Sequence, residues 1–241
     1  MSKPRIVCIT QARMTSTRLP AKIMRPILDR PMLAWHLQRL QRATLVDQVA
    51  VASVDAPESA PIVELARSLA VPVTLGSEED VLARFHQCAR EQRADVVVRV
   101  TSDCPLIDPE LIDAIIRRYL DGGVDYVSVE VGSYPRGFDA EVFSRAALDE
   151  AMAEAQEGGE REHVTPFIYR RPERYRCATL GGGAGGQYRL CVDQQEDLDL
   201  VTEVFRALAG KPAFGWRDVV AVMDADAHLA EINRAVMQKA H

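Results

Sequence analysis

The chain has 241 residues, of which 47% are hydrophobic and 27% charged, and its formal net charge is −6. This composition excludes a disordered chain or a fibrous repeat and predicts one sizeable buried core. No surplus of positive charge is available to bind a nucleic-acid backbone or an anionic membrane. Any basic patch must therefore be local and sized for a small anion.

The cysteines and the amino terminus bear on the cellular compartment. The five cysteines are odd in number, and none forms a C-x-x-C pair, so neither a disulfide framework nor a structural zinc site is predicted. The first residues carry no signal-peptide pattern, and no apolar stretch approaches the ~18 residues that cross a bilayer. We therefore expect a cytoplasmic protein with reduced thiols.

Strand-like and helix-like segments alternate through the first half of the chain. Strands are expected at residues 5–10, 49–54, 71–75 and 94–101, and helices at 31–43, 58–70, 77–89 and 108–123. In the third helix, Ser77 is expected as the N-cap and Asp80 at the third position of a capping box. The alternation predicts an α/β fold with a mostly parallel central sheet covered by helices on both faces.

After about residue 130 the alternation changes. Further strands are expected within residues 134–143 and 175–192, helices at 144–156 and 160–171, and a mostly helical tail from residue 194. The segment from about 130 to 190 is thus predicted to be a small antiparallel insertion in a single domain, 1–241. Residues 181–186 (GGGAGG) are expected to join two antiparallel strands, because phosphate-binding glycine loops lead into a helix instead.

A basic loop follows the first predicted strand, over residues 11–22. It holds Arg13, Arg18 and Lys22 together with three hydroxyl residues and no acid. Because ligands of open parallel sheets bind beyond the carboxyl ends of the strands, the loop is a candidate triphosphate site. The alternative is a solvated basic loop, which the absence of carboxylates makes awkward. It is not a Walker P-loop, because G-x-x-x-x-G-K-[ST] is absent.

Two aspartates follow short apolar runs. Asp103 lies just past a predicted central strand, which Pro105 prevents from continuing, and its carboxylate could bind Mg²⁺. Asp108 is better explained as a helix N-cap. Asp193 also precedes a helix, and the residues alone leave capping and metal binding equally open. In that helix, Asp197 is expected only to favour the dipole of the first turn.

Five segments, in the same order as in the family, carry a resemblance to cytidylyltransferases: QARMTSTRLPAKIM, TSDCPLIDPELID, YPRGFDAEVF, EREHVTPFI and LCVDQQEDLDLV. The chain most closely resembles the branch called spore coat polysaccharide biosynthesis protein F, related to the acylneuraminate and Kdo cytidylyltransferases. The resemblance extends from about residue 5 to residue 205. It implies the Rossmann-like fold of nucleotide-diphospho-sugar transferases.

The resemblance also implies a reaction, in which an acceptor oxygen attacks the α-phosphate of CTP with Mg²⁺ present and pyrophosphate leaves. Carried over by position, Lys22, Arg18 and Asp103 would be catalytic. Asp103 and Asp193 would bind the metal, which decides the question left open for Asp193. The residues implied to contact the nucleotide are Gln11, Ala12, Arg13, Arg18, Lys22, Ser77 and Asp103.

For the acceptor, the resemblance implies a second set of residues: Tyr134, Arg136, Glu141, Glu162 and His163. A sugar acid is the family default, and a small phosphate or phosphonate would suit the same charges. A homodimer is implied, with residues 134–143 or 160–169 near the partner's site. Thr15 and Ala21 replace the usual glycines of the basic loop, which matters only where φ is positive.

Two other functions stay open. A glycosyltransferase of the same fold would be expected to carry an Asp-x-Asp metal motif in mid-chain, but here that spacing occurs only late, at residues 197–199 and 224–226. A non-catalytic nucleotide-binding or assembly subunit would not need the full charge set of Lys22, Asp103 and Asp193.

Overall fold

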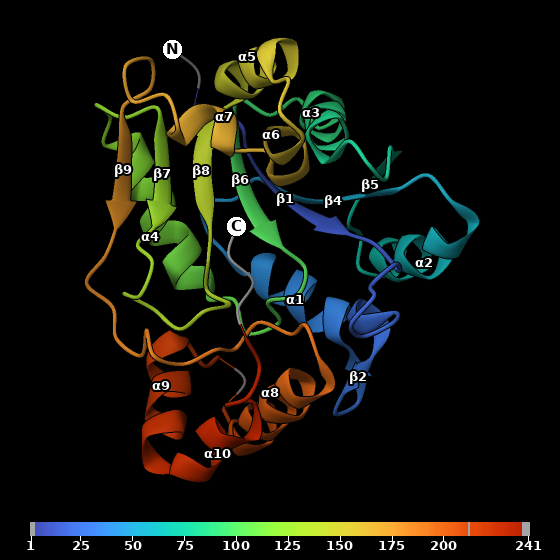
Figure 1. The fold of residues 1–241 in the computed structure, drawn as a ribbon, viewed down its shortest axis with the longest axis vertical. Helices are drawn as coiled ribbons and strands as arrows, with labels where there is room; N and C mark the ends of the chain where they lie inside the picture. Colours follow the sequence, from blue (N-terminus) through green and yellow to red (C-terminus); the bar gives the residue numbers. More distant parts are fainter. Residues whose placement is uncertain (1–2, 212, 238–241) are drawn as a thin grey trace.

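A seven-stranded sheet forms the centre of the computed structural model, which describes residues 3–211 and 213–237 (Figure 1). The strand order is β5-β4-β1-β6-β8-β7-β9. The strands are β1 (Ile6–Ala12), β4 (Gln48–Val54), β5 (Val73–Gly76), β6 (Val96–Thr101), β7 (Tyr126–Val129), β8 (Glu141–Ser144) and β9 (Cys177–Leu180). The first four strands of that order are parallel, β8 is antiparallel to both neighbours, and β9 is parallel to β7. The predicted mostly parallel sheet is confirmed.

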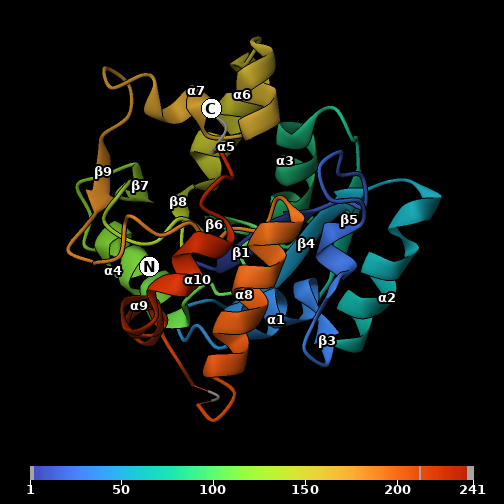
Figure 2. The ribbon, with the colours of Figure 1, turned by 60° about the horizontal axis from the view of Figure 1, so that its bottom comes forward.

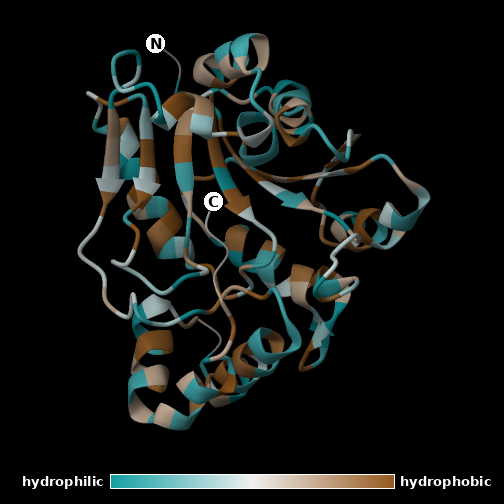
Figure 3. Ribbon diagram, viewed as in Figure 1, coloured by the Kyte–Doolittle hydropathy of each residue, from teal (hydrophilic) through white to brown (hydrophobic). Residues whose placement is uncertain are grey.

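Helices cover both faces of this sheet, as predicted. One face carries α1 (Met32–Leu40), α2 (Ala60–Ser68), α4 (Pro109–Leu120) and α8 (Gln195–Ala207), and the other carries α3 (Val81–Glu91), α5 (Arg145–Glu154), α6 (Gly158–His163) and α7 (Pro166–Tyr169). Strand side chains alternate between two buried clusters, with Ile6 in one and Val7 in the other. The inner strands are accordingly apolar almost throughout (Figure 3).

The carboxyl-terminal helices gather at the end of the molecule opposite α5, α6 and α7 (Figure 1). They are α8, α9 (Trp216–Ala225) and α10 (Ala227–Ile232), and α10 packs beside α8 (Figure 2). A short hairpin of β2 (Pro26–Ile27) and β3 (Arg30–Pro31) packs against α8. Among the described residues, no helix combines the length and apolar character needed to cross a bilayer.

Asp108 caps two helices at once. Its Oδ1 accepts from the backbone N–H of Glu110 at 2.8 Å, which confirms the predicted N-cap of α4. Its Oδ2 accepts from the backbone N–H of Trp216 at 2.7 Å, at the first residue of α9. One buried carboxylate therefore fixes α9 against the start of α4.

The expected strands of the second half are wrong in extent, and β7 was not predicted. Residues 134–140 are not part of β8, because the chain turns at Gly137 with φ 110°. A Cβ there would lie 2.8 Å from the backbone nitrogen of Cys191. This close approach replaces the expected strand pairing by a single parallel bridge between Arg136 and Arg189.

The expected role of residues 181–186 is also wrong. Strand β9, which precedes this loop, is parallel to β7. After the loop, the only strand pairing in the described chain is an isolated parallel bridge at Arg189, so the loop does not join two antiparallel strands. The loop packs on residues 132–135 so closely that a Cβ on Gly186 would collide with the backbone of Gly132. Glycine is needed here for backbone contact and not for a hairpin turn.

Two predicted helices begin or end differently. The helix expected at 160–171 is divided at Val164, which is buried with φ 71° while Thr165 N–H donates to the His163 carbonyl at 2.8 Å. This three-residue γ-turn is rare for a β-branched residue. The helix expected from Ser77 begins at Val81 instead, because Asp80 is its N-cap.

Removing the shared cap should cost more stability than removing an ordinary one. We expect Asp108→Ala to lower the free energy of unfolding by about 2 kcal/mol, since each lost cap costs about 1 kcal/mol. The measurement is urea denaturation followed by circular dichroism. Asp226→Ala, which removes the single exposed cap of α10, is the control and should cost about 1 kcal/mol. Equal losses in the two variants would contradict the double cap.

Candidate active site

The carboxyl ends of β1 and β6 bring the predicted charged residues to one place. Gln11 of β1 pairs with Thr101 of β6, so the basic loop and the turn that carries Asp103 start side by side. The Asp103 carbonyl accepts from the backbone N–H of Val192 at 2.8 Å. This contact places Asp193 next to the same edge, although no strand leads into it.

Lys22 lies at the centre of the charged cluster. Its Nζ donates to Asp103 Oδ2 at 3.0 Å, to Asp193 Oδ1 at 2.9 Å and to the Val192 carbonyl at 2.9 Å. These contacts use all three ammonium donors. Arg18 Nη2 lies 2.8 Å from the same Asp193 Oδ1. The structure thus brings together four of the residues predicted to act on the triphosphate and the metal.

The charges of this cluster stabilise one another. Burial alone would raise the pKa of Asp103, but the Lys22 charge and the hydrogen bonds from Thr101 and Lys22 outweigh it and hold that pKa well below its usual range. Burial likewise opposes ionisation of Asp193, yet Lys22 lowers its pKa. The two carboxylates in turn raise the pKa of Lys22 against the effect of burial. All three groups are therefore ionised at neutral pH.

The basic loop is folded back on itself around Ala21. Ala21 has φ 53°, and its N–H donates to the Met14 carbonyl at 3.2 Å. The backbone is therefore strained where Ala21 replaces the usual glycine. Thr15, the other replacement, is not among the described residues with positive φ. Thr15 Oγ1 instead donates to Glu78 at 2.6 Å, and Arg13 lies 4.0 Å from the same carboxylate. The loop thus has an acidic neighbour that the local sequence does not reveal.

Three polar groups border the loop on the α3 side. Helix α3 packs against β1, whose Gln11 has a buried Oε1 without a partner in the described chain. Arg84 of α3 is buried, donates to the Ser77 carbonyl and keeps its Nε unpartnered among the described residues. The Ser77 hydroxyl accepts from the backbone N–H of Asp80 at 3.1 Å. Sequence reasoning missed Arg84, because its position resembles any polar residue of an amphipathic helix.

Arg189 is a second residue that sequence reasoning missed. Its Nη2 lies 2.8 Å from Asp193 Oδ2, and its Nε lies 3.0 Å from Asp197 Oδ1. Asp197 is fully buried and accepts from the backbone N–H groups of Asp193 and Gln194. The expectation that Asp197 only favours the helix dipole is therefore incomplete, and Asp193 is not the cap of α8, because Gln194 holds that position.

Glu141 is part of a closed network on the α3 side of the sheet. Its carboxylate accepts from Arg99, from the Tyr126 hydroxyl at 2.5 Å and from Thr165 Oγ1 at 2.7 Å. Thr165 is the residue after the strained turn, so the network joins β6, β7 and β8 to the start of α7. Contact of Glu141 with an acceptor remains a prediction.

The other predicted acceptor residues are not gathered in one cluster. Tyr134 packs edge-on against Trp216, with ring centroids 5.1 Å apart, and its hydroxyl donates to the Gly181 carbonyl. Arg136 is nearer the charged cluster, because its carbonyl accepts from Leu190 N–H at 2.7 Å in the segment that ends at Asp193. Glu162 and His163 lie at the end of α6, with Glu162 exposed. The role of these four residues also remains a prediction.

His36 connects strand β1 to the turn that carries Asp103. Its Nδ1 lies 2.9 Å from the Cys104 carbonyl, which can only accept, so Nδ1 carries the proton. Its Nε2, 3.0 Å from Thr10 Oγ1, then accepts from that hydroxyl. Burial lowers the pKa of His36 to about 4. A neutral imidazole therefore links β1, α1 and the turn that carries Asp103.

The two aspartates suit a magnesium ion that arrives with phosphate. Their carboxylate oxygens converge on one ammonium, and oxygen is the ligand that Mg²⁺ prefers. Within residues 3–211 and 213–237, no group of three or more His, Cys, Asp or Glu side chains is placed to hold a metal. This fits Mg²⁺, which commonly takes one or two carboxylates and completes its shell with water and substrate phosphates.

The strain at Ala21 gives a stability prediction. We expect Ala21→Gly to leave the free energy of unfolding unchanged or to raise it by up to about 1 kcal/mol, because relief of the left-handed conformation offsets the added entropy of the unfolded chain. Ala153→Gly, at an exposed position of α5, should instead cost about 1 kcal/mol. Thermal and urea denaturation measure both variants, and equal losses would contradict the strain.

His36 predicts a pH dependence of stability. Because its pKa falls from 6.5 in the unfolded chain to about 4 in the folded one, the unfolded state binds the extra proton between these values. Stability should therefore fall as the pH drops from 6.5 to 4, by about 3 kcal/mol from this group. His36→Asn keeps a donor for the Cys104 carbonyl and removes the titration. The unfolding free energies of the two proteins should converge toward pH 4, and parallel pH profiles would refute the assignment.

Comparison with known proteins agrees with this geometry. A family model described as Cytidylyltransferase matches residues 7–211. Spore coat polysaccharide biosynthesis protein SpsF of Bacillus subtilis is 31% identical over 228 residues, covering 91% of this chain and 94% of that protein. A cytidylyltransferase structure from Leptospira borgpetersenii has a TM-score of 0.90 at 26% identity, covering 99% of this chain and 100% of that one. A structure of CMP:2-keto-3-deoxy-manno-octonic acid synthetase complexed with CTP shares the fold, with a TM-score of 0.68 at 16% identity over 84% of this chain and 99% of that chain. The chain therefore belongs to the cytidylyltransferase family and is a nucleotidyltransferase enzyme.

Proposed function

We propose that this enzyme transfers CMP from CTP to an oxygen of a sugar acid, with Mg²⁺, and releases pyrophosphate. The acceptor oxygen forms a bond to the α-phosphorus, the bond from that phosphorus to the oxygen bridging to the β-phosphate breaks, and the acceptor hydroxyl loses its proton. The observation that carries the proposal is the convergence of Lys22, Asp103 and Asp193 at the strand ends. A sugar acid is proposed because a relative that is 30% identical over 75% of this chain is named 3-deoxy-manno-octulosonate cytidylyltransferase.

Phosphoryl transfer asks the protein mainly to position the reactants and to neutralise charge. Arg18 and Lys22 supply two cations beside the carboxylates, and Arg13 supplies a third that is more exposed. A triphosphate would compete with Asp193 for the donors of Arg18 and Lys22. These charge-assisted hydrogen bonds would orient the triphosphate and favour the departing pyrophosphate.

Asp103 and Asp193 would hold the magnesium ion. When bound, Mg²⁺ supplies positive charge to the phosphate oxygens as a Lewis acid. The task of the two aspartates is to offer ionised oxygens at neutral pH, which their lowered pKa values support. Arg189, on the far oxygen of Asp193, limits how that carboxylate can rotate.

The α3 side of the loop is the proposed site of the cytosine base. The unpartnered Gln11 Oε1 and Arg84 Nε are an acceptor and a donor that are already buried. Cytosine offers an amino donor and ring acceptors, which match this pair. Burying such groups without partners costs stability, and a bound base would relieve that cost. Ser77 would take part through its carbonyl, which orients Arg84.

The residues proposed to bind the acceptor are chosen for their charge. Arg136 is a permanent cation on the loop beside the segment that ends at Asp193, and His163 is a titratable donor near Thr165. Such groups suit a carboxylate-bearing acceptor, and a small phosphate or phosphonate would satisfy the same chemistry. A homodimer is also proposed, with residues 134–143 or 160–169 near the partner's site.

Nucleotide binding tests the proposal without knowledge of the acceptor. We expect calorimetry to show selective binding of CTP over UTP, ATP, GTP and UDP-glucose, with a higher affinity when Mg²⁺ is present. Lys22→Met should weaken CTP binding at least about 10-fold, because it removes a charge-assisted hydrogen bond to phosphate. Lys211→Met is the matched control, because that exposed lysine pairs with Asp218 and its loss should leave CTP affinity unchanged.

The other outcomes are informative. Tight binding of UDP-glucose without preference for CTP would favour glycosyl transfer instead. Binding of no nucleotide would favour a non-catalytic assembly subunit. Selective CTP binding would justify a screen of sugar acids, phosphates and phosphonates for pyrophosphate release.

A further inference from the structure

One polar residue is buried in the carboxyl-terminal arm, residues 226–237, whose other residues are exposed or only partly buried. Helix α10 has no buried residue, and in the described chain after Met223 only Asn233 is buried, with 6% of its surface exposed. The apolar residues Leu229, Ala230 and Ile232 of the arm are only partly buried against the core, so the most buried side chain of the arm is a polar one. An amide is buried at acceptable cost only when its hydrogen bonds are satisfied.

The side-chain amide of Asn233 donates its hydrogen bonds to Asp197 and Arg189, which both contact Asp193. Its Nδ2 donates to Asp197 Oδ1 at 2.8 Å and to the Arg189 carbonyl at 3.0 Å. Both donors of the amide are thus used, and both acceptors belong to residues that contact Asp193. This polar contact therefore anchors the arm in addition to its partly buried apolar side chains, Leu229, Ala230 and Ile232.

Asp197 transmits this anchor to Asp193 in two ways. Its Oδ2 accepts from the backbone N–H of Asp193 at 2.9 Å, which fixes the backbone at that residue. It also holds the Arg189 guanidinium, whose Nη2 lies 2.8 Å from Asp193 Oδ2. Because Asp193 Oδ1 faces Lys22 and Arg18, both oxygens of the carboxylate have a set direction.

We propose that Asn233 is a positioning residue for the nucleotide-bound metal, acting through Asp197 and Arg189 to orient the Asp193 carboxylate. This inference rests on the proposed function. Asn233 lies beyond residues 7–211, the segment matched by the family model, so that match does not include this contact. Residues that orient metal ligands typically change metal affinity about 10–100-fold when replaced.

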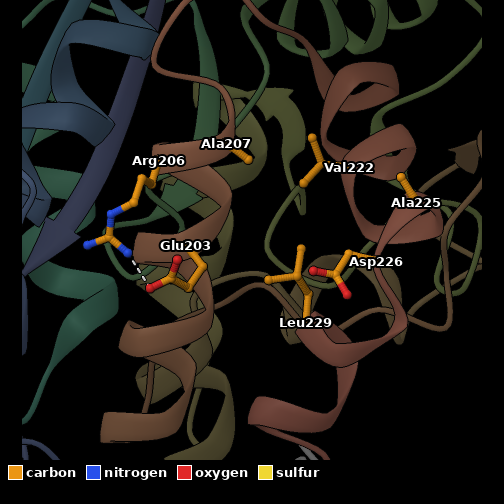
Figure 4. Close-up of a pocket in the computed structure, with 7 residues that line it drawn as sticks. All are labelled: Glu203, Arg206, Ala207, Val222, Ala225, Asp226 and Leu229. Carbon is orange, nitrogen blue, oxygen red and sulfur yellow. Dashed lines mark hydrogen bonds and ion pairs between the residues drawn. The ribbon is translucent and has the colours of Figure 1, made fainter.

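A nearby hollow offers a control for general damage to the arm. A cavity of about 440 Å³ lies between α8, α9 and α10 (Figure 4). Leu229 points into it from α10 and has no polar contact with the Asp193 network. Leu229→Ala should therefore loosen the packing of the arm without changing the orientation of the carboxylate.

The test compares Mn²⁺ binding in the presence of saturating CTP, measured by electron paramagnetic resonance. Asn233→Leu keeps the shape of the side chain and removes both hydrogen bonds. We expect its apparent affinity for Mn²⁺ to fall about 10-fold. CTP affinity without metal should stay within about twofold, because Arg18 and Lys22 are untouched. Leu229→Ala should lower thermal stability and leave both affinities unchanged.

Each outcome has one meaning. If the wild-type protein binds no CTP with metal, the proposed function fails before this inference is reached. If it does, and Asn233→Leu binds Mn²⁺ as the wild type does, the positioning role is wrong. Equal losses of Mn²⁺ affinity and of metal-free CTP affinity would also overturn the positioning role, because they indicate general damage to the protein. If Asn233→Leu does not fold, Asn233→Asp replaces it, and its carboxylate beside Asp197 should weaken Mn²⁺ binding likewise.

Discussion

The contact of one ammonium with two carboxylates is the constraint on which the rest of the site depends. Along the chain, Asp103 lies 81 residues after Lys22, and Asp193 lies 171 residues after Lys22. Burying this many charges is tolerable only because they pair closely, and loss of one partner leaves the others uncompensated. Three segments of the chain must therefore be held in register, and much of the surrounding structure serves that requirement.

Each segment is fixed by a different device. Parallel pairing of β1 with β6 sets the first two, because the ends of adjacent parallel strands lie together. In the described chain, the third segment does not follow directly from a strand. It is held by the Asp103 carbonyl, by close backbone packing at Gly137 and by the buried carboxylate of Asp197. His36 adds a neutral support under the turn of Asp103.

Two of the described non-glycine residues with positive φ lie in segments that carry predicted functional residues, and the others are Leu28, Ala70 and Arg93. Ala21 is left-handed next to Lys22, and Val164 occupies a γ-turn between His163 and Thr165. Such conformations cost of order 1–3 kcal/mol and persist only where the surrounding structure determines them. In both cases the residue after the strained one joins a polar network through its side chain. Lys22 donates to Asp103 and Asp193, and Thr165 donates to Glu141.

The sequence by itself determined the parallel half of the fold, the basic loop, and Asp103 at a strand end, because apolar runs and strand-end residues are local features. The cap at Asp108 was equally local. Local pattern overestimated the strands after residue 130, because backbone packing at Gly137 and Gly186 overrides propensity there. Only the tertiary structure decided the partners of Lys22 and the roles of Arg189, Asp197 and Asn233. Those roles arise from contacts between distant segments, which no periodicity within one segment records.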